Sequence, residues 1–335
     1  MDHVIVTIEN SSTMVAGGAG FVGSALVREL LALGCRVIVY DNFLHGSPSH
    51  VDNLGPGVVV VEGDARDRSH LYDVLRRECV QFVFNCVGDT FVPDAYDHPA
   101  RFFDNNTAAA VSVLLASRDA MVEAVLYVSS TEVYGLVGHD RPIDESLPCC
   151  PVNTYAVSKV AADRACHTIH IEHGLPVVLA RIFNCYGPRE THPYIVPELI
   201  SQLHRGPRLR LGNVAASRDF TYVEDTARAL VRLMECGPVD ATPVNVGSGR
   251  AVTIADLAQH VGRLYGYERV DIELDSGRLR RRDIECFVCD PTRLRELTGW
   301  LPRVDLHTGL RRTVDWYESN GRMWSFERRG VTIRG

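Results

Sequence analysis

Among the 35 basic residues of the chain there is a single lysine, Lys159, and every other one is an arginine. Tyr155 precedes this lysine by four positions. On a helix, residues four positions apart share one face. A nearby ammonium stabilises tyrosinate, so the spacing predicts a tyrosine whose pKa is lowered toward general-base work. Lysine is a compact charge with three rotatable donors, and we expect arginine's rigid fork to fail in the same place.

A glycine-rich segment near the start of the chain has the types and spacing of a phosphate-binding turn. Gly17, Gly20 and Gly23 form GxxGxxG between a strand pattern and a helical pattern, and such glycines let a diphosphate approach backbone N–H groups at a helix N-terminus. Asp41 closes the next strand pattern, where a carboxylate can accept hydrogen bonds from both adenosine ribose hydroxyls. It is followed by Asn42, with no arginine beside it to hold a 2′-phosphate. These residues predict a dinucleotide site that favours NAD over NADP.

The elements that must position these residues alternate between two periods. Short β-branched runs alternate with segments whose apolar residues recur at helical spacing, which predicts βαβ units in a parallel, doubly wound α/β sheet of Rossmann type. We expect residues 1–183 to form mainly this dinucleotide-binding domain. Residues 184–335 are expected to form mainly a smaller mixed C-terminal lobe, with some elements interleaved. The expected strands lie at 14–16, 36–40, 57–61, 82–86, 124–128 and 177–181, and the expected helices at 21–33, 69–77, 106–120 and 154–172.

Composition excludes several classes of protein. The net charge of −7 leaves no electrostatic footprint for nucleic acid. No apolar run approaches the roughly 18 residues of a membrane helix, so we expect no membrane span. No secretory signal is visible, and the ten cysteines are scattered rather than regularly spaced, so we expect a cytoplasmic protein with free thiols.

Two groups of potential metal ligands are interpreted as structural. Cys286 and Cys289 form a CxxC, but no second CxxC or paired histidine follows at zinc-finger spacing. His167, His170 and His173 recur every three residues before a glycine, as on one polar edge near the C-terminal end of a helix. The sequence therefore predicts no metal site.

The glycine motif, Asp41 and Tyr155-x-x-x-Lys159 together resemble the extended short-chain dehydrogenase/reductases. Within these the chain is similar to the nucleotide-sugar epimerase/dehydratase group, over about residues 13–320. The resemblance implies an NAD cofactor, a UDP- or dTDP-linked sugar as substrate, a second lobe that binds it, and a homodimer formed through helices 106–120 and 154–172. Further matching stretches lie at 61–64, 104–106, 129–135, 181–188, 218–223, 244–249 and 298–302.

The resemblance also implies roles for individual residues. Tyr155 would remove the proton from a sugar hydroxyl while NAD takes the hydride, Ser130 would share that proton, and Lys159 would hold ribose. Arginine suits a substrate diphosphate because its fork meets phosphate oxygens bidentately. The implied substrate ligands are Ser130, Asn184, Arg218 and one arginine of 280–282, taken as Arg280. The implied cofactor contacts are Gly17, Gly20, Phe21, Val22, Gly23, Asp41, Asn42, Asp64, Ala65, Val87, Asn106, Tyr155 and Lys159.

One segment departs from the family pattern. Residues 85–89 read Asn-Cys-Val-Gly-Asp, where the family usually has His-x-Ala-Ala. This departure puts the side-chain contacts near the nicotinamide ribose in question.

The reaction that follows oxidation depends on Thr131 and Glu132. A 4-epimerase needs no second acid or base, because its keto-sugar only rotates before it is reduced again. The 4,6-dehydratases have a segment that resembles Thr-Asp-Glu at this place, and its Asp is the acid that supplies a proton. This chain has Thr131 in place of that Asp, so the acid is missing. Glucuronate decarboxylases have Ser/Thr-Ser-Glu, which is closer to this chain. We expect an NAD-dependent nucleotide-sugar epimerase; a decarboxylase or dehydratase that uses Glu132 is the alternative, and an NAD-sensing protein is the non-enzymatic one.

Overall fold

The computed structural model describes residues 7–136, 141–237, 239–279 and 285–321. Its centre is a sheet of seven strands, all parallel. Parallel strands are buried on both faces, which is why β5 is buried at every residue. The predicted doubly wound parallel sheet is confirmed. In spatial order the strands are β10 (Asp240–Val246), β6 (Val177–Ile182), β5 (Ala124–Ser130), β4 (Phe82–Asn85), β1 (Ser12–Ala16), β2 (Arg36–Asp41) and β3 (Val58–Glu62).

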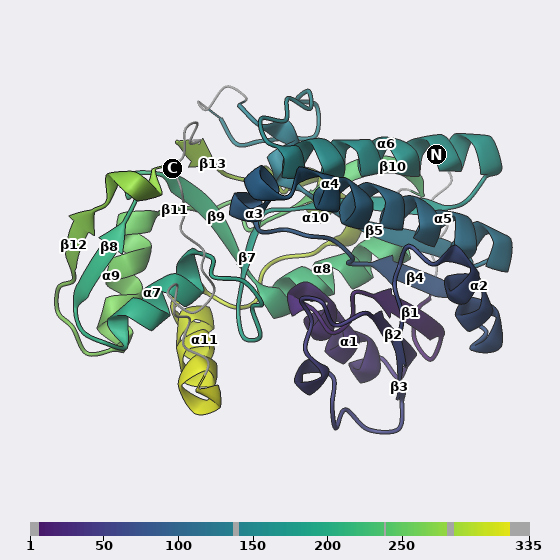
Figure 1. Ribbon diagram of the computed structural model, residues 1–335, viewed down its shortest axis with the longest axis horizontal. Helices are drawn as coiled ribbons and strands as arrows, with labels where there is room; N and C mark the ends of the chain where they lie inside the picture. The colour runs from purple at the N-terminus through teal and green to yellow at the C-terminus, as the bar shows by residue number, and fades with distance from the viewer. Residues whose placement is uncertain (1–6, 137–140, 238, 280–284, 322–335) are drawn as a thin grey trace.

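Helices cover both faces of this sheet and bury one apolar layer on each. Apolar residues of α1 (Phe21–Ala32) and α8 (Val223–Cys236) pack on one face, with α10 (Thr292–Thr298) beside them. Those of α2 (Arg68–Arg77), α5 (Ala109–Ala120) and α6 (Thr154–His173) pack on the other. Figure 1 shows α5 and α6 side by side along the sheet.

A second lobe extends from the carboxyl ends of the strands, at the left of Figure 1. Its own apolar core joins helices to short strands. The helices are α7 (Ile195–Leu203), α9 (Ile254–Leu264) and α11 (Leu306–Asn320). The strands are β7 (Asn184–Tyr186), β8 (Arg208–Leu211), β9 (Ser217–Tyr222), β11 (Ala251–Thr253), β12 (Asp271–Leu274) and β13 (Cys286–Phe287).

The chain returns to the main sheet after it has entered this lobe. β10 pairs with β6 although it lies far beyond residue 183, and α8 packs against α1. The main sheet therefore takes one edge strand from the second half of the chain. The division of the chain at residue 183 stays a prediction.

Short elements connect the larger ones and carry several cavity residues. The helix expected at 106–120 has an irregular start, because a π-helical turn, η2 (Phe103–Ala108), precedes α5. Within the described residues, no helix is long and apolar enough to cross a membrane. The remaining short helices are η1 (Pro48–His50), α3 (Val92–Asp97), α4 (Pro99–Phe102), η3 (Thr131–Tyr134) and η4 (Ser276–Arg278).

Candidate active site

A cavity of about 1010 Å³ opens where the sheet meets the second lobe. Segments that follow β1, β2, β3, β4, β5 and β6 all contribute to its wall, so it lies at the carboxyl edge of the sheet, where doubly wound folds bind ligands. Most of the predicted site residues meet there. They are Gly17, Gly20, Phe21, Val22, Gly23, Asp41, Asn42, Asp64, Ala65, Val87, Ser130, Thr131, Glu132, Tyr155, Lys159, Asn184 and Arg218.

Among the described residues, one predicted site residue, Asn106, is not part of this wall. Asn106 is fully buried behind it, where its amide group brackets the backbone of Asp89: Oδ1 accepts from the Asp89 nitrogen over 2.7 Å and Nδ2 donates to the Asp89 oxygen over 3.0 Å. Its predicted contact with cofactor stays a prediction. Arg280 lies outside the described residues.

The glycine turn leaves no room for side chains. Gly17 has a φ of +76°, and a Cβ there would lie 2.9 Å from the carbonyl carbon of Cys86. A Cβ at Gly23 would lie 2.1 Å from the oxygen of Gly17. The first turn of α1 has neither a side-chain cap nor an acidic residue. Its open N–H groups and positive dipole end fit an anionic diphosphate.

Asp41 is fixed by the backbone at the end of β2. Its Oδ2 accepts a hydrogen bond from the nitrogen of Ala19 over 2.9 Å, and its Oδ1 accepts one from the nitrogen of Phe43 over 2.8 Å. Burial raises the pKa of Asp41, and these hydrogen bonds oppose the rise. The carboxylate is thus held at the edge of the cavity, in the place expected for a ribose ligand.

Asp64, the predicted adenine-side residue, is held by Arg66. Nε of Arg66 donates to Oδ1 of Asp64 over 2.9 Å, and the second pair of atoms lies 2.5 Å apart. This contact is the main cause that holds the pKa of Asp64 below its ordinary value. Both carboxylates therefore face the cavity in a defined orientation.

Tyr155 and Lys159 share one face of α6, as the spacing predicts. Asn153 caps the helix, since its Oδ1 accepts from the nitrogen of Ala156 over 2.8 Å. Burial raises the pKa of Tyr155, and a hydrogen bond with Ser130 opposes the rise. The expected lowering of this pKa by Lys159 is wrong for this structure, because desolvation of the buried phenol outweighs any help from the lysine.

The ammonium of Lys159 is directed to β5 instead. Nζ donates to the oxygen of Val128 over 2.9 Å and to the hydroxyl of Tyr127 over 3.2 Å. It also lies 4.8 Å from the centre of the Tyr127 ring, within cation–π range. Burial lowers the pKa of Lys159 to about 8. The lysine is therefore anchored by neutral partners at the wall of the cavity.

The end of β5 delivers Ser130, Thr131 and Glu132 to the cavity through the short helix η3. Oγ of Ser130 caps this turn by accepting from the nitrogen of Glu132 over 3.2 Å. Oε2 of Glu132 accepts from Nδ2 of Asn153 over 3.3 Å. The residue that caps the tyrosine helix thus also orients the glutamate.

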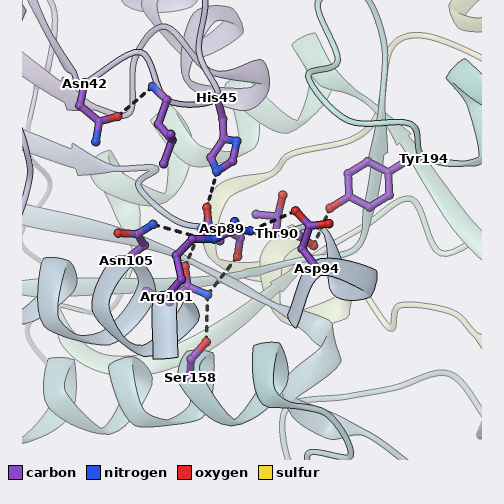
Figure 2. Close-up of polar contacts among 11 residues, drawn as sticks. Asn42, His45, Asp89, Thr90, Asp94, Arg101, Asn105, Ser158 and Tyr194 are labelled. Carbon is purple, nitrogen blue, oxygen red and sulfur yellow. Dashed lines mark hydrogen bonds and ion pairs between the residues drawn. The ribbon is translucent and has the colours of Figure 1, made fainter. Parts of the chain in front are cut away.

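A polar network around Asp89 is the largest feature that sequence reasoning missed (Figure 2). Asp89 is 2% exposed; its Oδ1 contacts Nε2 of His45, and its Oδ2 accepts from Arg101 over 2.7 Å and from Asn105 over 3.2 Å. Burial alone would raise the pKa of Asp89, but His45 and Arg101 hold it below the ordinary value. The only signal in the sequence was the departure from the family pattern at 85–89.

His45 and Asp89 both line the cavity, so the network connects the loop after β2 to α4 and η2. Nη2 of Arg101 also reaches Asp94, 3.0 Å away. The loop that follows Asp41 is thereby tied, through Asp89, to the segment after β4 and to α4.

The second lobe supplies charged groups at the other end of the cavity. Asn184 and Arg218, the predicted substrate ligands, line it there, and Arg218 donates to the oxygen of Ser217 over 2.9 Å. Arg278 also lines the cavity and forms an ion pair with Glu198. Arg278 was not predicted, because its place next to the cavity depends on the fold of the second lobe. Within the part of the chain that the structure describes, no group of three or more His, Cys, Asp or Glu side chains is arranged to hold a metal.

Proteins of known structure share this architecture. A UDP-glucose 4-epimerase from Lacticaseibacillus casei is 28% identical over 328 residues, which cover 91% of this chain and 96% of that protein. The structure of a UDP-glucose 4-epimerase from Thermotoga maritima with UDP-glucose has a TM-score of 0.84 at 27% identity, covering 93% of this chain and all of the other. That of a dTDP-glucose 4,6-dehydratase from Streptomyces venezuelae with NAD has a TM-score of 0.85 at 29% identity, covering 94% and 99%.

The family comparison covers most of the chain. The model of the NAD dependent epimerase/dehydratase family matches residues 13–247, from the first strand of the sheet to the turn after its last. Relatives of this family include both epimerases and dehydratases, so the fold is common to the two reactions. The predicted NAD cofactor is confirmed, and the chain belongs to the NAD-dependent epimerase/dehydratase family.

Proposed function

We propose that this protein is an NAD-dependent nucleotide-sugar 4-epimerase. One observation carries the proposal: Ser130, Tyr155 and Lys159 line one cavity together, while the position before Glu132 is a threonine rather than an acid. The three residues are the set needed to oxidise and re-reduce a sugar hydroxyl. Elimination of water would need an additional proton donor beside Glu132, and Thr131 does not supply one.

NAD, when bound, supplies the hydride acceptor and a positively charged ring beside the substrate. As a phenolate, Tyr155 would take the proton of the sugar hydroxyl at its ring oxygen, and Ser130 would share that proton through the hydrogen bond between the two side chains. Burial raises the pKa of Tyr155, so the positive charges of Lys159 and of bound NAD would have to offset this rise before the phenolate could take a proton. Lys159 would hold the cofactor ribose with the one donor that its two contacts to β5 leave open.

The substrate's nucleotide part is assigned to the second lobe. Asn184 and Arg218 line the cavity from β7 and β9 of the second lobe, and relatives of this chain include a UDP-glucose 4-epimerase and a dTDP-glucose 4,6-dehydratase. A guanidinium there can bind a diphosphate bidentately. With the diphosphate fixed, a keto-sugar is free to rotate about its bond to phosphate, which is all that epimerisation requires.

Glu132 supports a second candidate function. Its carboxylate lines the cavity near Tyr155, so a dehydratase or a glucuronate decarboxylase could use it as a base. The contact with Asn153 favours a structural role instead, because it ties the glutamate to the cap of α6. A protein that only senses NAD would not need the buried tyrosine, serine and lysine together.

The test is a product analysis. The purified protein is incubated with NAD and a panel of UDP- and dTDP-linked hexoses and glucuronates, and products are followed by mass and by chromatography against authentic stereoisomers. A new stereoisomer of unchanged mass supports the epimerase. Loss of water supports a dehydratase and loss of carbon dioxide a decarboxylase, and either result would replace the epimerase. Tyr155→Phe is the control: it should bind NAD and turn over nothing.

The outer surfaces of α5 and α6 support a homodimer. Val157 and Ile171 on α6 and Met121 at the end of α5 are exposed apolar side chains. Two such helix pairs would bury these side chains in a four-helix bundle. The ten cysteines are all unpaired, which supports a reducing compartment such as the cytoplasm. Sedimentation analysis of the native protein tests the dimer.

A further inference from the structure

Asp163 continues the face of α6 that carries Tyr155 and Lys159. The three residues follow one another at intervals of four positions, so each lies about one turn beyond the last. The side chain of Asp163 is 3% exposed, and it is not among the described side chains that line the cavity. A carboxylate buried one turn behind the catalytic pair is unexplained by the binding of either ligand.

Arg181 on β6 keeps this carboxylate charged. Nε of Arg181 donates to Oδ2 of Asp163 over 3.0 Å, and the arginine side chain is also 3% exposed. Burial raises the pKa of Asp163, and the guanidinium opposes the rise first among its neighbours. A guanidinium does not give up its proton in a protein, so the pair stays ionised rather than neutralising.

The arginine is itself fixed by a chain of hydrogen bonds. Nη1 of Arg181 donates to the hydroxyl of Tyr134 over 3.0 Å, and that hydroxyl donates to Oδ1 of Asn245 over 2.8 Å. Nη2 of Arg181 donates to Sγ of Cys149 over 3.4 Å, so each nitrogen of the guanidinium has a partner. Among the described residues, by contrast, Oδ1 of Asp163 accepts no hydrogen bond. The hydroxyl of Ser129 also helps to hold down the pKa of Asp163, so this carboxylate interacts with its surroundings through its charge and through that nearby hydroxyl.

Lys159, in turn, has no negatively charged hydrogen-bond acceptor among the described residues. Its ammonium donates only to neutral oxygens within the described residues, those of Val128 and Tyr127. Burial lowers the pKa of Lys159 to about 8, and Asp163 is the charge that opposes this lowering most. Without that charge the pKa of Lys159 would fall further, because the neutral oxygens that accept its hydrogen bonds do not offset the burial.

The other titratable groups around Lys159 stay neutral at pH 7. Tyr127 faces it from β5, Cys86 from the end of β4 and Cys166 from α6. Burial raises the pKa of Cys86 to about 12 and that of Tyr127 and Cys166 well above the ordinary value. None of the three can replace a carboxylate as a source of negative charge.

We propose that Asp163, kept ionised by Arg181, is a positioning residue that holds Lys159 as an ammonium at neutral pH. It touches neither cofactor nor substrate and acts through the lysine. An ammonium has three donors, so it can keep both contacts to β5 and still present one to a ribose hydroxyl. The catalytic consequence rests on the proposed function, whereas the charge state of Lys159 does not.

The single lysine of the chain makes the test direct. Protein grown with lysine labelled with ¹³C at Cε and carrying no lysine-containing tag gives one side-chain resonance, and its shift against pH reports Lys159 alone. The wild type should titrate near pH 8. Asp163→Asn should titrate at least about one pH unit lower, and Asp163→Glu near the wild type. Asp119→Asn, which removes a surface carboxylate paired with Arg68, is the matched control and should not move it.

An unchanged Lys159 titration in Asp163→Asn would overturn the proposal, whatever happens to activity. If circular dichroism shows that this variant does not fold, the double variant Asp163→Asn/Arg181→Gln, which removes both charges of the Asp163–Arg181 pair, is titrated with the same two outcomes. In the activity arm, kcat of Asp163→Asn should fall with rising pH earlier than in the wild type and recover toward pH 6. If Lys159 titrates at lower pH in Asp163→Asn but the wild type turns over no nucleotide sugar, the role of Asp163 is supported and only the proposed function fails.

Discussion

Nζ of Lys159 donates to the backbone oxygen of Val128 over 2.9 Å, which joins α6, the helix that carries Tyr155, to β5. The lysine side chain is 4% exposed and lies against the ring of Tyr127. A guanidinium is larger, planar and rigid, so it cannot enter this space and keep the same contacts. The lone lysine of an arginine-rich chain thus stands where arginine does not fit.

Lys159→Arg should lower kcat/KM by at least about 100-fold while it preserves the net charge. The measurement is steady-state turnover of whichever nucleotide sugar the product analysis identifies. Arg232→Lys, a surface exchange in the opposite direction, is the control and should leave turnover unchanged. Comparable activity of Lys159→Arg and the wild type would contradict the assigned role of the lysine.

The first half of the site could be predicted because its chemistry is local in sequence. One βαβ unit, from β1 to β2, holds the glycines of GxxGxxG and Asp41, and one helix, α6, holds Tyr155 and Lys159. Spacing along the chain is therefore enough to place these residues. The parallel sheet could be predicted for the same reason, because strand patterns and helical patterns alternate along the chain. These features require no knowledge of which distant segments meet.

The features that were missed depend on contacts between distant segments. His45, in the loop after β2, contacts Asp89, which follows β4, and Asp163 on α6 contacts Arg181 on β6. No periodicity encodes such a pairing. The expected effect of Lys159 on Tyr155 was wrong because spacing shows which groups are near, whereas burial decides the sign of the pKa shift.

Asp89→Asn should weaken NAD binding about tenfold, because it loosens the loop that follows Asp41. The change removes the charge that His45 and Arg101 share, and about 1.4 kcal/mol corresponds to a factor of ten in affinity. Titration calorimetry with NAD is the measurement. Asp94→Asn, which also loses a contact with Arg101 but none with His45, is the matched control and should bind NAD nearly as well as the wild type. Equal affinities of all three proteins would exclude a role for the network in cofactor binding.

Glu132→Gln separates the two candidate functions. A glutamine keeps an oxygen for the Asn153 contact but cannot take a proton, so an epimerase should retain most of its kcat. A dehydratase or decarboxylase that uses this group as its base should lose at least about 100-fold. Turnover of the two proteins is compared on the same nucleotide sugar. A dead Glu132→Gln variant would move the assignment to the second candidate.

Glu190 should make the protein less stable at alkaline pH. This carboxyl group is 4% exposed, and burial raises its pKa from 4.5 to about 8. Between these two values the folded state binds a proton that the unfolded state has released, so the free energy of unfolding falls as pH rises through that window. Glu190→Gln cannot ionise and should unfold a few degrees higher than the wild type at pH 9, where about 1 kcal/mol corresponds to 2–4 °C.

At pH 5 the same substitution should change the unfolding temperature little, because most of the destabilisation has not yet developed. Glu273→Gln, at an exposed surface position, is the control and should be neutral at both values of pH. An equal effect of Glu190→Gln at pH 5 and pH 9 would show that the carboxyl group is not held protonated by burial.

The central claim is that Tyr155 and NAD oxidise a sugar carbon transiently and return the same hydride to its other face. The most direct measurement uses a nucleotide sugar carrying deuterium at C4, with mass and NMR analysis of the product. The account predicts the 4-epimer, unchanged in mass and with the deuterium still at C4, and no product from Tyr155→Phe. Loss of water or carbon dioxide, or deuterium found at another carbon, would contradict it.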